Sequence, residues 1–144
     1  MDKSLLVTGE FTEAMKKVGA VLLRRLDTDK AGVRSAFWYY FPDVKSWKLV
    51  IASEKVDLEG PREFYKRVVK AIQTAPKKNP TISLNDIGVT NMSNPIVRLI
   101  GIAIGTPSNA VGDIRFSRNT INGNFIEDAY IYRSNIQDDI KRSA

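Results

Sequence analysis

The sequence predicts an α+β fold: a single domain in which two or three helices pack on an antiparallel sheet built from two β-hairpins. Three observations predict this fold. An amphipathic segment precedes the first strand-like run, a two-residue turn signal separates two alternating segments, and proline opens two further apolar segments where helices would begin. The 144 residues, 43% of them hydrophobic, suffice for one core, so residues 1–144 are expected to form one domain.

The first helix is expected from about Gly9 to Leu26, because apolar residues recur there at helical spacing. These residues are Phe11, Ala14, Met15, Val18, Val21, Leu22 and Leu26. Lys16, Lys17 and Arg24 lie between them and give the helix a polar side. The sequence DTDKAG then breaks the pattern, so a helix that covers one face of a sheet is predicted.

The stretch SAFWYYFP, residues 35–42, is expected to form the first strand of the first hairpin. Phe37, Trp38, Tyr39 and Tyr40 follow one another, with Phe41 directly behind them. A turn containing Pro and Asp comes next, and WKLVIAS, residues 47–53, is the partner strand. Because side chains alternate along a strand, the run presents aromatic rings to both faces of the sheet.

The aromatic run has two interpretations, a stacking platform for nucleic-acid bases or a core strand. Trp47, Leu49 and Ile51 supply apolar neighbours for one face, which favours a core role for about half of the rings. For the other half, Tyr39 included, the alternatives are a sheet covered on both faces or an aromatic face sealed by a partner or second subunit. RNA-binding strands place Lys, Arg and Gly among their aromatics, and this run has none, so we favour core or protein interface over base stacking.

The middle of the chain predicts two further helices and a short strand. Pro61 stands where a helix begins, and an apolar stripe follows it: Phe64, Tyr65, Val68, Ala71 and Ile72. Residues 74–80 have the composition of a loop, and residues 87–90 that of a short strand. Asn94 and Pro95 then precede the apolar segment IVRLIGIAIG, which is either a third helix or a buried turn.

The clearest local signal is Asn122-Gly123, a type I′ turn pair between two alternating segments. A two-residue turn there pairs Ile121 with Asn124 and, further along, Arg118 with Glu127, Ser117 with Asp128, Phe116 with Ala129 and Arg115 with Tyr130. One face then carries Ile114, Phe116, Phe125, Ala129 and Ile131, while the polar side chains gather on the other. The candidate surface for a ligand or partner, with Tyr39 added from the first hairpin, is Arg115, Ser117, Asp128, Tyr130, Tyr132 and Tyr39. A solvated polar face is the competing interpretation of the hairpin side chains.

The net charge of +6 and the pI near 9.6 favour anionic partners. Residues 1–72 carry 14 Lys and Arg against 10 Asp and Glu, and residues 73–144 carry 8 against 6, so the excess is spread along the chain. At near-physiological salt we therefore expect binding to generic nucleic acid to be weaker than about 10 μM. The candidate phosphate-contacting residues are Arg62, Lys66, Arg67, Lys70, Lys77 and Lys78.

The absence of both Cys and His removes Ser-His-Asp, Cys-His and imidazole or thiolate zinc chemistry. Asp43, Lys45 and Glu54 resemble parts of the acid and lysine set of metal-dependent nucleases, but their spacing does not match that arrangement. No glycine-rich phosphate loop precedes a Lys and Ser or Thr. We therefore lean against an enzyme and assign no catalytic residue, metal ligand or cofactor.

These observations favour a small soluble, non-catalytic binding or assembly module that acts through a protein partner or through self-association as a homo-oligomer. The alternative is a nucleic-acid-binding accessory domain that uses the basic helix and loop, and an oxygen-ligated metal-dependent enzyme comes third. The sequence has neither a membrane-length apolar segment nor a signal peptide at Met1, so no membrane partner is expected and the cytoplasm is the predicted location.

Overall fold

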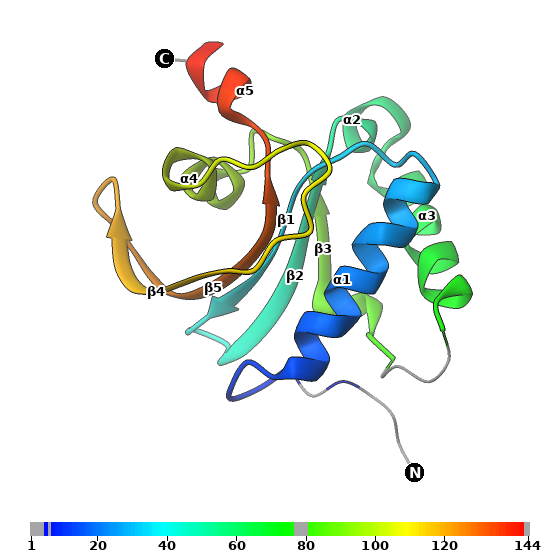
Figure 1. Ribbon diagram of the computed structural model, residues 1–144, viewed down its shortest axis with the longest axis horizontal. Helices are drawn as coiled ribbons and strands as arrows, with labels where there is room; N and C mark the ends of the chain where they lie inside the picture. Colours follow the sequence, from blue (N-terminus) through cyan, green and yellow to red (C-terminus); the bar gives the residue numbers. More distant parts are fainter. Residues whose placement is uncertain (1–4, 6, 77–80, 143–144) are drawn as a thin grey trace.

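The structure of the protein, a computed structural model, describes residues 5, 7–76 and 81–142. It contains one five-stranded sheet with the strand order β3-β2-β1-β5-β4 (Figure 1). The elements in chain order are α1 (Glu13–Thr28), β1 (Val33–Phe41), β2 (Ser46–Ser53), α2 (Lys55–Glu59), α3 (Pro61–Thr74), η1 (Leu84–Asp86), β3 (Ile87–Thr90), α4 (Pro95–Ala103), β4 (Ile114–Ile121), β5 (Asn124–Ser134) and α5 (Gln137–Arg142).

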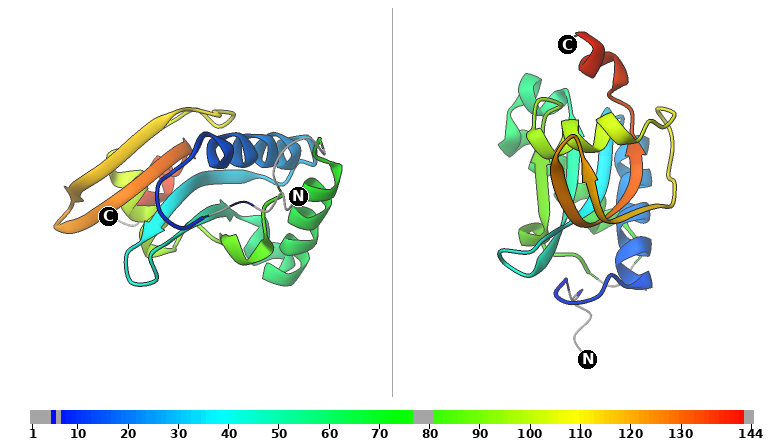
Figure 2. Two further views of the ribbon diagram at one scale, coloured as in Figure 1. Left: turned by 90° about the horizontal axis from the view of Figure 1, so that it is seen from below. Right: turned by 90° about the vertical axis from the view of Figure 1, so that its left-hand side faces the viewer.

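Helices cover both faces of the sheet (Figure 1, Figure 2). One core lies between the sheet and helices α1 and α3, and it includes Leu22, Trp38 and Phe64. A second core lies on the opposite face beneath α4 and the start of α5, and it includes Phe37 and Val97. Within the described residues, none of the helices combines the length and the apolar composition needed to cross a membrane.

The α+β class is confirmed, but the prediction of a purely antiparallel sheet is wrong. The two predicted hairpins are β1–β2 and β4–β5, and β1 joins them by pairing with β5. Strand β3 instead pairs parallel to β2, with Leu49 opposite Ile87 and Ala52 opposite Thr90. The chain leaves β2 through α2 and α3 before it returns, and such a helical crossover brings the next strand back in the same direction. The short helices α2 and α5 were not predicted.

Helix α1 begins four residues later than the apolar pattern suggests, because Thr12 caps it. The Thr12 hydroxyl accepts a hydrogen bond from the Met15 amide at 3.2 Å, which satisfies one of the free N–H groups of the first turn. Met15 and Leu26 are fully buried against the sheet. Phe11 therefore lies in the segment before the helix and not on its apolar stripe.

The aromatic run is a strand covered on both faces. Trp38 faces the α1–α3 core and Phe37 faces the α4 core, and both side chains have 0% exposure. The Trp38 indole donates to the Met15 carbonyl at 3.1 Å, so its polar group is also satisfied. Trp47 lies on the next strand in the same core and is 2% exposed. The expected core role is confirmed for Phe37 and Trp38, which present no ring surface on which a base could stack, and Trp47 lies in the same core as Trp38.

The predicted turn at Asn122-Gly123 is confirmed, with φ angles of +51° and +82° and Ile121 opposite Asn124. The predicted face of Phe125 is wrong. Arg118 has a φ of +45°, and the alternation of faces changes at this point of the hairpin. Ile126 is consequently buried in the second core, whereas Phe125 is 59% exposed. The tip of the hairpin curves toward the side on which α4 lies (Figure 1).

Replacing Gly123 by Ala is expected to lower the free energy of unfolding by about 1–2 kcal/mol through backbone strain alone. A Cβ atom at Gly123 would meet no atom within 4 Å, so no clash contributes. Urea unfolding of the variant measures the cost, with Asn122→Gly as the control because glycine tolerates the φ of +51° at that position. An unchanged unfolding midpoint for Gly123→Ala would show that this turn does not constrain the hairpin.

Candidate functional site

A groove of about 650 Å³ lies between the segment that precedes α1 and the polar face of the β4–β5 hairpin. Residues 9–11 form one wall, and Tyr40 and Trp47 lie between the walls. The other wall consists of the hairpin residues Arg115, Ser117, Arg118, Glu127 and Asp128. We call this site the hairpin groove. It lies beside β4, one of the two edge strands of the sheet.

Arg115 is the most firmly held charged side chain of the hairpin groove. Its Nε and Nη2 donate to the two oxygens of Asp128 at 2.6 and 2.5 Å, and the Ser117 hydroxyl donates to the same carboxylate at 3.0 Å. This pairing raises the pKa of Arg115. The Arg115 guanidinium carbon also lies 5.2 Å from the ring centre of Phe11 and 5.8 Å from that of Trp47, within the range of cation–π attraction. Within the described part of the chain Nη1 has no hydrogen-bond acceptor, so its donors are available to a ligand.

Aromatic rings support the groove from below. The ring centre of Phe11 lies 4.9 Å from those of both Trp47 and Tyr130, and the ring of Tyr40 lies 5.4 Å from Trp47. The Trp47 indole donates to the carbonyl of Gly9 at 3.0 Å, which ties the segment before α1 to the sheet. Phe11 and Tyr40 remain partly exposed, so the groove offers pre-positioned apolar surface next to the Arg115 guanidinium.

Three of the six residues predicted for the partner surface line the hairpin groove, namely Arg115, Ser117 and Asp128. Tyr130 is 4% exposed beneath Phe11, and its burial, followed by its hydrogen bond to Asp113, raises its pKa to about 12. Tyr132 is 1% exposed and donates to the Lys16 carbonyl at 2.7 Å. Tyr39 packs against the α4 core on the other face of the sheet, where burial raises the pKa of its hydroxyl. Tyr132 and Tyr39 therefore lie outside the groove.

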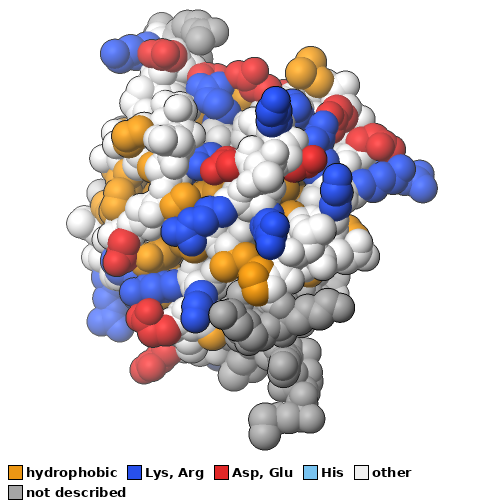
Figure 3. All heavy atoms as spheres, turned by 45° about the vertical axis from the view of Figure 1, so that its right-hand side comes forward, with side chains coloured by type: hydrophobic (Ala, Val, Ile, Leu, Met, Phe, Trp, Pro, Cys, Tyr) orange, Lys and Arg blue, Asp and Glu red, His pale blue; other side chains and the backbone are white. Residues whose placement is uncertain are grey.

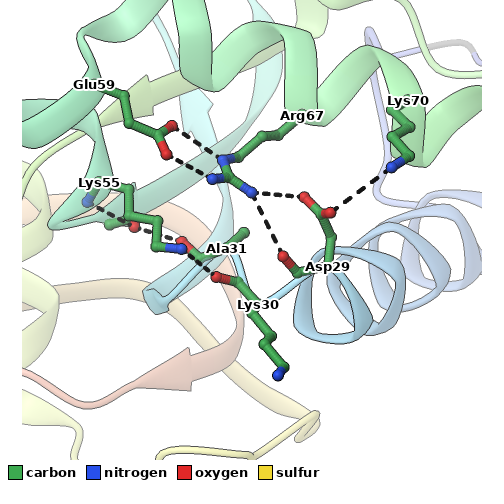
Figure 4. A network of polar contacts seen from close by, with 8 residues as sticks. Asp29, Lys30, Ala31, Lys55, Glu59, Arg67 and Lys70 are labelled. Atoms are coloured by element: carbon green, nitrogen blue, oxygen red, sulfur yellow. Dashed lines mark hydrogen bonds and ion pairs between the residues drawn. The ribbon is translucent and has the colours of Figure 1, made fainter.

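The predicted phosphate-contacting residues are not equivalent in the structure. Arg67 donates to Glu59 at 2.5 and 3.0 Å and to Asp29 at 2.8 Å, and these pairs raise its pKa (Figure 4). Lys70 lies 3.9 Å from Asp29, and Lys66 lies 3.0 Å from Glu63 one turn away. Arg62 is exposed at the start of α3. Lys77 and Lys78 lie outside the described residues. Arg67 thus links α3 to the end of α1 and is the least available of these cations.

Sequence reasoning missed the aromatic part of the groove, Phe11, Tyr40 and Trp47. The cross-strand pair of Tyr40 and Trp47 follows from the register of the first hairpin and was available as a signal. Phe11 gave no such signal, because it fits the apolar stripe of α1 and yet lies before the helix begins.

The acidic residues considered for a metal-dependent nuclease lie apart in the structure. No group of three acidic side chains among the described residues could hold a metal ion. Asp43 lies in the exposed turn before β2, whereas Glu54 follows the other end of β2 and pairs with Arg34 at 2.6 Å. The carboxylate of Asp128, which faces the groove, is neutralised by Arg115.

Comparison with known proteins adds no functional information. No protein-family model matches the chain, and no curated protein or solved structure matches it either. What the protein does must therefore be inferred from its surfaces.

Proposed function

We propose that the protein is a small cytoplasmic, non-catalytic binding module that engages a protein partner, or another copy of itself, through the hairpin groove. The observation that supports this proposal is the arrangement of Arg115. Asp128, whose carboxylate also accepts from the Ser117 hydroxyl, fixes the guanidinium, Phe11 and Trp47 lie under it, and its Nη1 donors remain available.

This arrangement has the chemistry of a protein interface. Arg, Tyr and Trp supply a large share of binding energy at interfaces, because they combine extensive apolar contact with directed hydrogen bonds. Arg115 is already held by Asp128, so binding would cost little of the conformational entropy that an exposed arginine normally loses. A partner segment with an apolar side chain for Tyr40 and Phe11 and a carbonyl or carboxylate for Arg115 fits these groups.

The shape of the β4 edge favours a partner that contacts the side chains of the groove over a partner that adds a strand to the sheet. Strand β4 is one of the two edge strands of the sheet, and an open edge can pair with another chain. Arg118, however, adopts a left-handed φ of +45° in the middle of β4 and interrupts the flat edge. Local bends and charges are the usual means by which edge strands avoid such pairing. Binding is therefore assigned to the groove.

Substituting Arg115 by Ala or Tyr40 by Ser is expected to weaken partner binding about 10- to 30-fold each, the effect of losing a central interface residue. The tagged chain is purified from the cells that produce it, and the proteins retained in stoichiometric amounts are identified. Affinity is then measured by calorimetry with the purified partner. Light scattering of the chain alone detects self-association, which the same substitutions should abolish.

Phe125→Ser is the matched control, because it removes an exposed aromatic ring at the hairpin tip, outside the groove. Circular dichroism establishes that each variant is folded. Partner binding or self-association that is unchanged by both groove substitutions, or lost equally in Phe125→Ser, would contradict the proposal.

A further inference from the structure

The fold concentrates the positive charge that appears diluted along the sequence. Helices α1 and α3 together contain eight Lys and Arg residues against three Asp and Glu residues. They therefore carry five of the six formal charges by which the whole chain is positive. Counting charges by halves of the sequence conceals this, because the rest of residues 1–72 carries six Lys and Arg residues against seven Asp and Glu residues.

The two helices share one side of the molecule. Arg25 and Thr28 of α1 face Arg67 and Lys70 of α3 across a small cavity of about 280 Å³. Figure 3, in which this side comes forward, shows Lys and Arg side chains spread over the face. We call the cations that the two helices place on this side the basic helix face: Lys17, Arg24, Arg25, Arg62, Lys66 and Lys70.

The charges of the basic helix face are largely available to a ligand. Lys17, Arg24 and Arg62 are exposed and form no ion pair within the described ranges. The pairs of Lys66 and Lys70 are solvent-exposed, and such pairs contribute little to stability. Arg67 has a different role, since Glu59 and Asp29 engage it and it fixes α3 against the end of α1 (Figure 4).

We propose that the basic helix face binds the phosphodiester backbone of nucleic acid, at a site separate from the hairpin groove. The 16 residues of α1 extend over about 24 Å, which corresponds to about seven steps along a nucleic-acid strand. Cations at positions 17 and 24 lie two turns apart on one side of α1, while positions 62, 66 and 70 follow one another at one-turn spacing on α3. Such a surface contacts phosphates without reading the base sequence.

The surroundings of these cations favour nucleic acid over a membrane surface. A helix that binds at a lipid interface buries large apolar side chains between the headgroups. The large hydrophobic side chains that are exposed in the described part of the chain are Val44, Leu58, Leu84, Ile102 and Phe125. None of these residues belongs to α1 or α3. The apolar side chains of α1 and α3 instead line a groove between the two helices, among them Val21 and Ile72, and none of them is exposed enough to enter a lipid layer as an anchor.

Fluorescence anisotropy with labelled oligonucleotides, single strands of 30 nucleotides and duplexes of 30 base pairs, tests the proposal. About four phosphate contacts should make affinity fall about 20-fold for a single strand and about 50-fold for a duplex when salt rises from 50 to 150 mM. The dissociation constant is expected near 1 μM at 50 mM salt, so binding at 150 mM becomes weaker than about 10 μM. Affinity that is independent of salt would overturn the proposal, as would the absence of binding at 50 mM salt.

Charge reversal localises the site. The pair Lys17→Glu and Arg24→Glu should weaken binding at 50 mM salt at least tenfold, and Arg62→Glu with Lys66→Glu should act alike. The matched control is Lys45→Glu with Lys48→Glu, which makes the same change in net charge at two exposed lysines outside the two helices. The control should weaken binding less than threefold. A loss in the control pair as large as that in the helix pairs would mean that only net charge matters, and would overturn the proposed site.

Two further measurements separate this proposal from its alternatives. Vesicles containing phosphatidylserine should bind less tightly than the oligonucleotides at equal salt, and the reverse order would overturn nucleic acid as the ligand. Arg115→Ala should leave oligonucleotide binding unchanged, which supports two separate sites. A tenfold loss in Arg115→Ala would instead place the nucleic acid in the hairpin groove and overturn the assignment to α1 and α3.

Discussion

Replacing Gly19 by Ala is expected to destabilise the protein by about 2–3 kcal/mol, even though Ala favours a helix more strongly than Gly. Gly19 lies on the side of α1 that touches the sheet. A Cβ atom there would lie 2.2 Å from the hydroxyl oxygen of Tyr132 and 2.7 Å from its ring carbon Cζ. Either α1 must move away from the sheet or Tyr132 must leave its position, and both changes disturb the α1–α3 core.

Displacing Tyr132 would lower the free energy of unfolding, because its hydroxyl connects α1 to two strands. It donates to the Lys16 carbonyl at 2.7 Å and accepts from the Trp38 indole at 3.1 Å. The side chain is 1% exposed, and burial raises its pKa well above the usual value for tyrosine. Gly19 is therefore the residue that lets α1 approach closely enough for this hydrogen-bond bridge.

A double-mutant cycle measures the contact directly. Tyr132→Phe alone should cost about 1–2 kcal/mol, since it leaves buried partners unsatisfied. In that background Gly19→Ala should cost at least about 1 kcal/mol less, because the closest clashing atom is gone. Urea unfolding gives both values. Gly88→Ala is the control, as a Cβ at Gly88 meets no atom within 4 Å. Additive effects of the two substitutions would contradict the packing argument.

Elements that depend on local chemistry could be predicted from the sequence. The turn at Asn122-Gly123 needs only two residues that tolerate positive φ, and Pro61 marks the first residue of α3 because its missing N–H is harmless there. The alternation of large side chains likewise indicated that Trp38 is buried. The turn and the helix start rest on interactions within a few residues along the chain, whereas the burial of Trp38 is completed by α1, a distant segment.

Features that depend on distant contacts could not be predicted. Strand β3 has only four residues, and nothing in them distinguishes parallel pairing with β2 from antiparallel pairing. The left-handed φ of Arg118 changes which side chains of the hairpin face the core, so Ile126 is buried in the place predicted for Phe125. Strict alternation of side chains cannot locate such a bend, because arginine is not one of the residue types that favour a positive φ.

The candidate sites also combine parts that local sequence predicts with parts that only contacts between distant segments create. Arg115, Ser117 and Asp128 lie together as the predicted pairing of β4 with β5 requires. That pairing is set by the two-residue turn, which is a local feature of the sequence. Phe11 completes the groove only through the fold, which brings the segment before α1 beside β2 and β5. The basic helix face likewise arises when α1 and α3 pack together. Surfaces assembled from distant segments are therefore the part of function that the linear sequence conceals.

Replacing Arg133 by Met is expected to be among the most damaging single substitutions, with a loss of about 3 kcal/mol in the free energy of unfolding. Arg133 is 1% exposed and ties three segments together. Its Nη1 and Nη2 donate to the Asp27 oxygens at 2.9 and 2.7 Å, Nη1 also donates to the Val33 carbonyl at 3.0 Å, and Nε donates to the Ala110 carbonyl at 3.0 Å. Met fills similar volume but satisfies none of these acceptors, so two carbonyls lose their buried donor.

Two companion variants of this network separate its charge from its hydrogen bonds. Asp27→Asn should cost less, about 1–2 kcal/mol, because the buried guanidinium loses its counter-ion but keeps both carbonyl acceptors and an amide oxygen at position 27. Arg133→Lys keeps the charge, but a single ammonium cannot reach three acceptors that lie on different segments, so it should fall between the other two variants. Thermal and urea unfolding of the three variants give the order. A loss in Asp27→Asn as large as that in Arg133→Met would show that the ion pair, and not the carbonyl bonds, stabilises this junction of α1, β1 and β5.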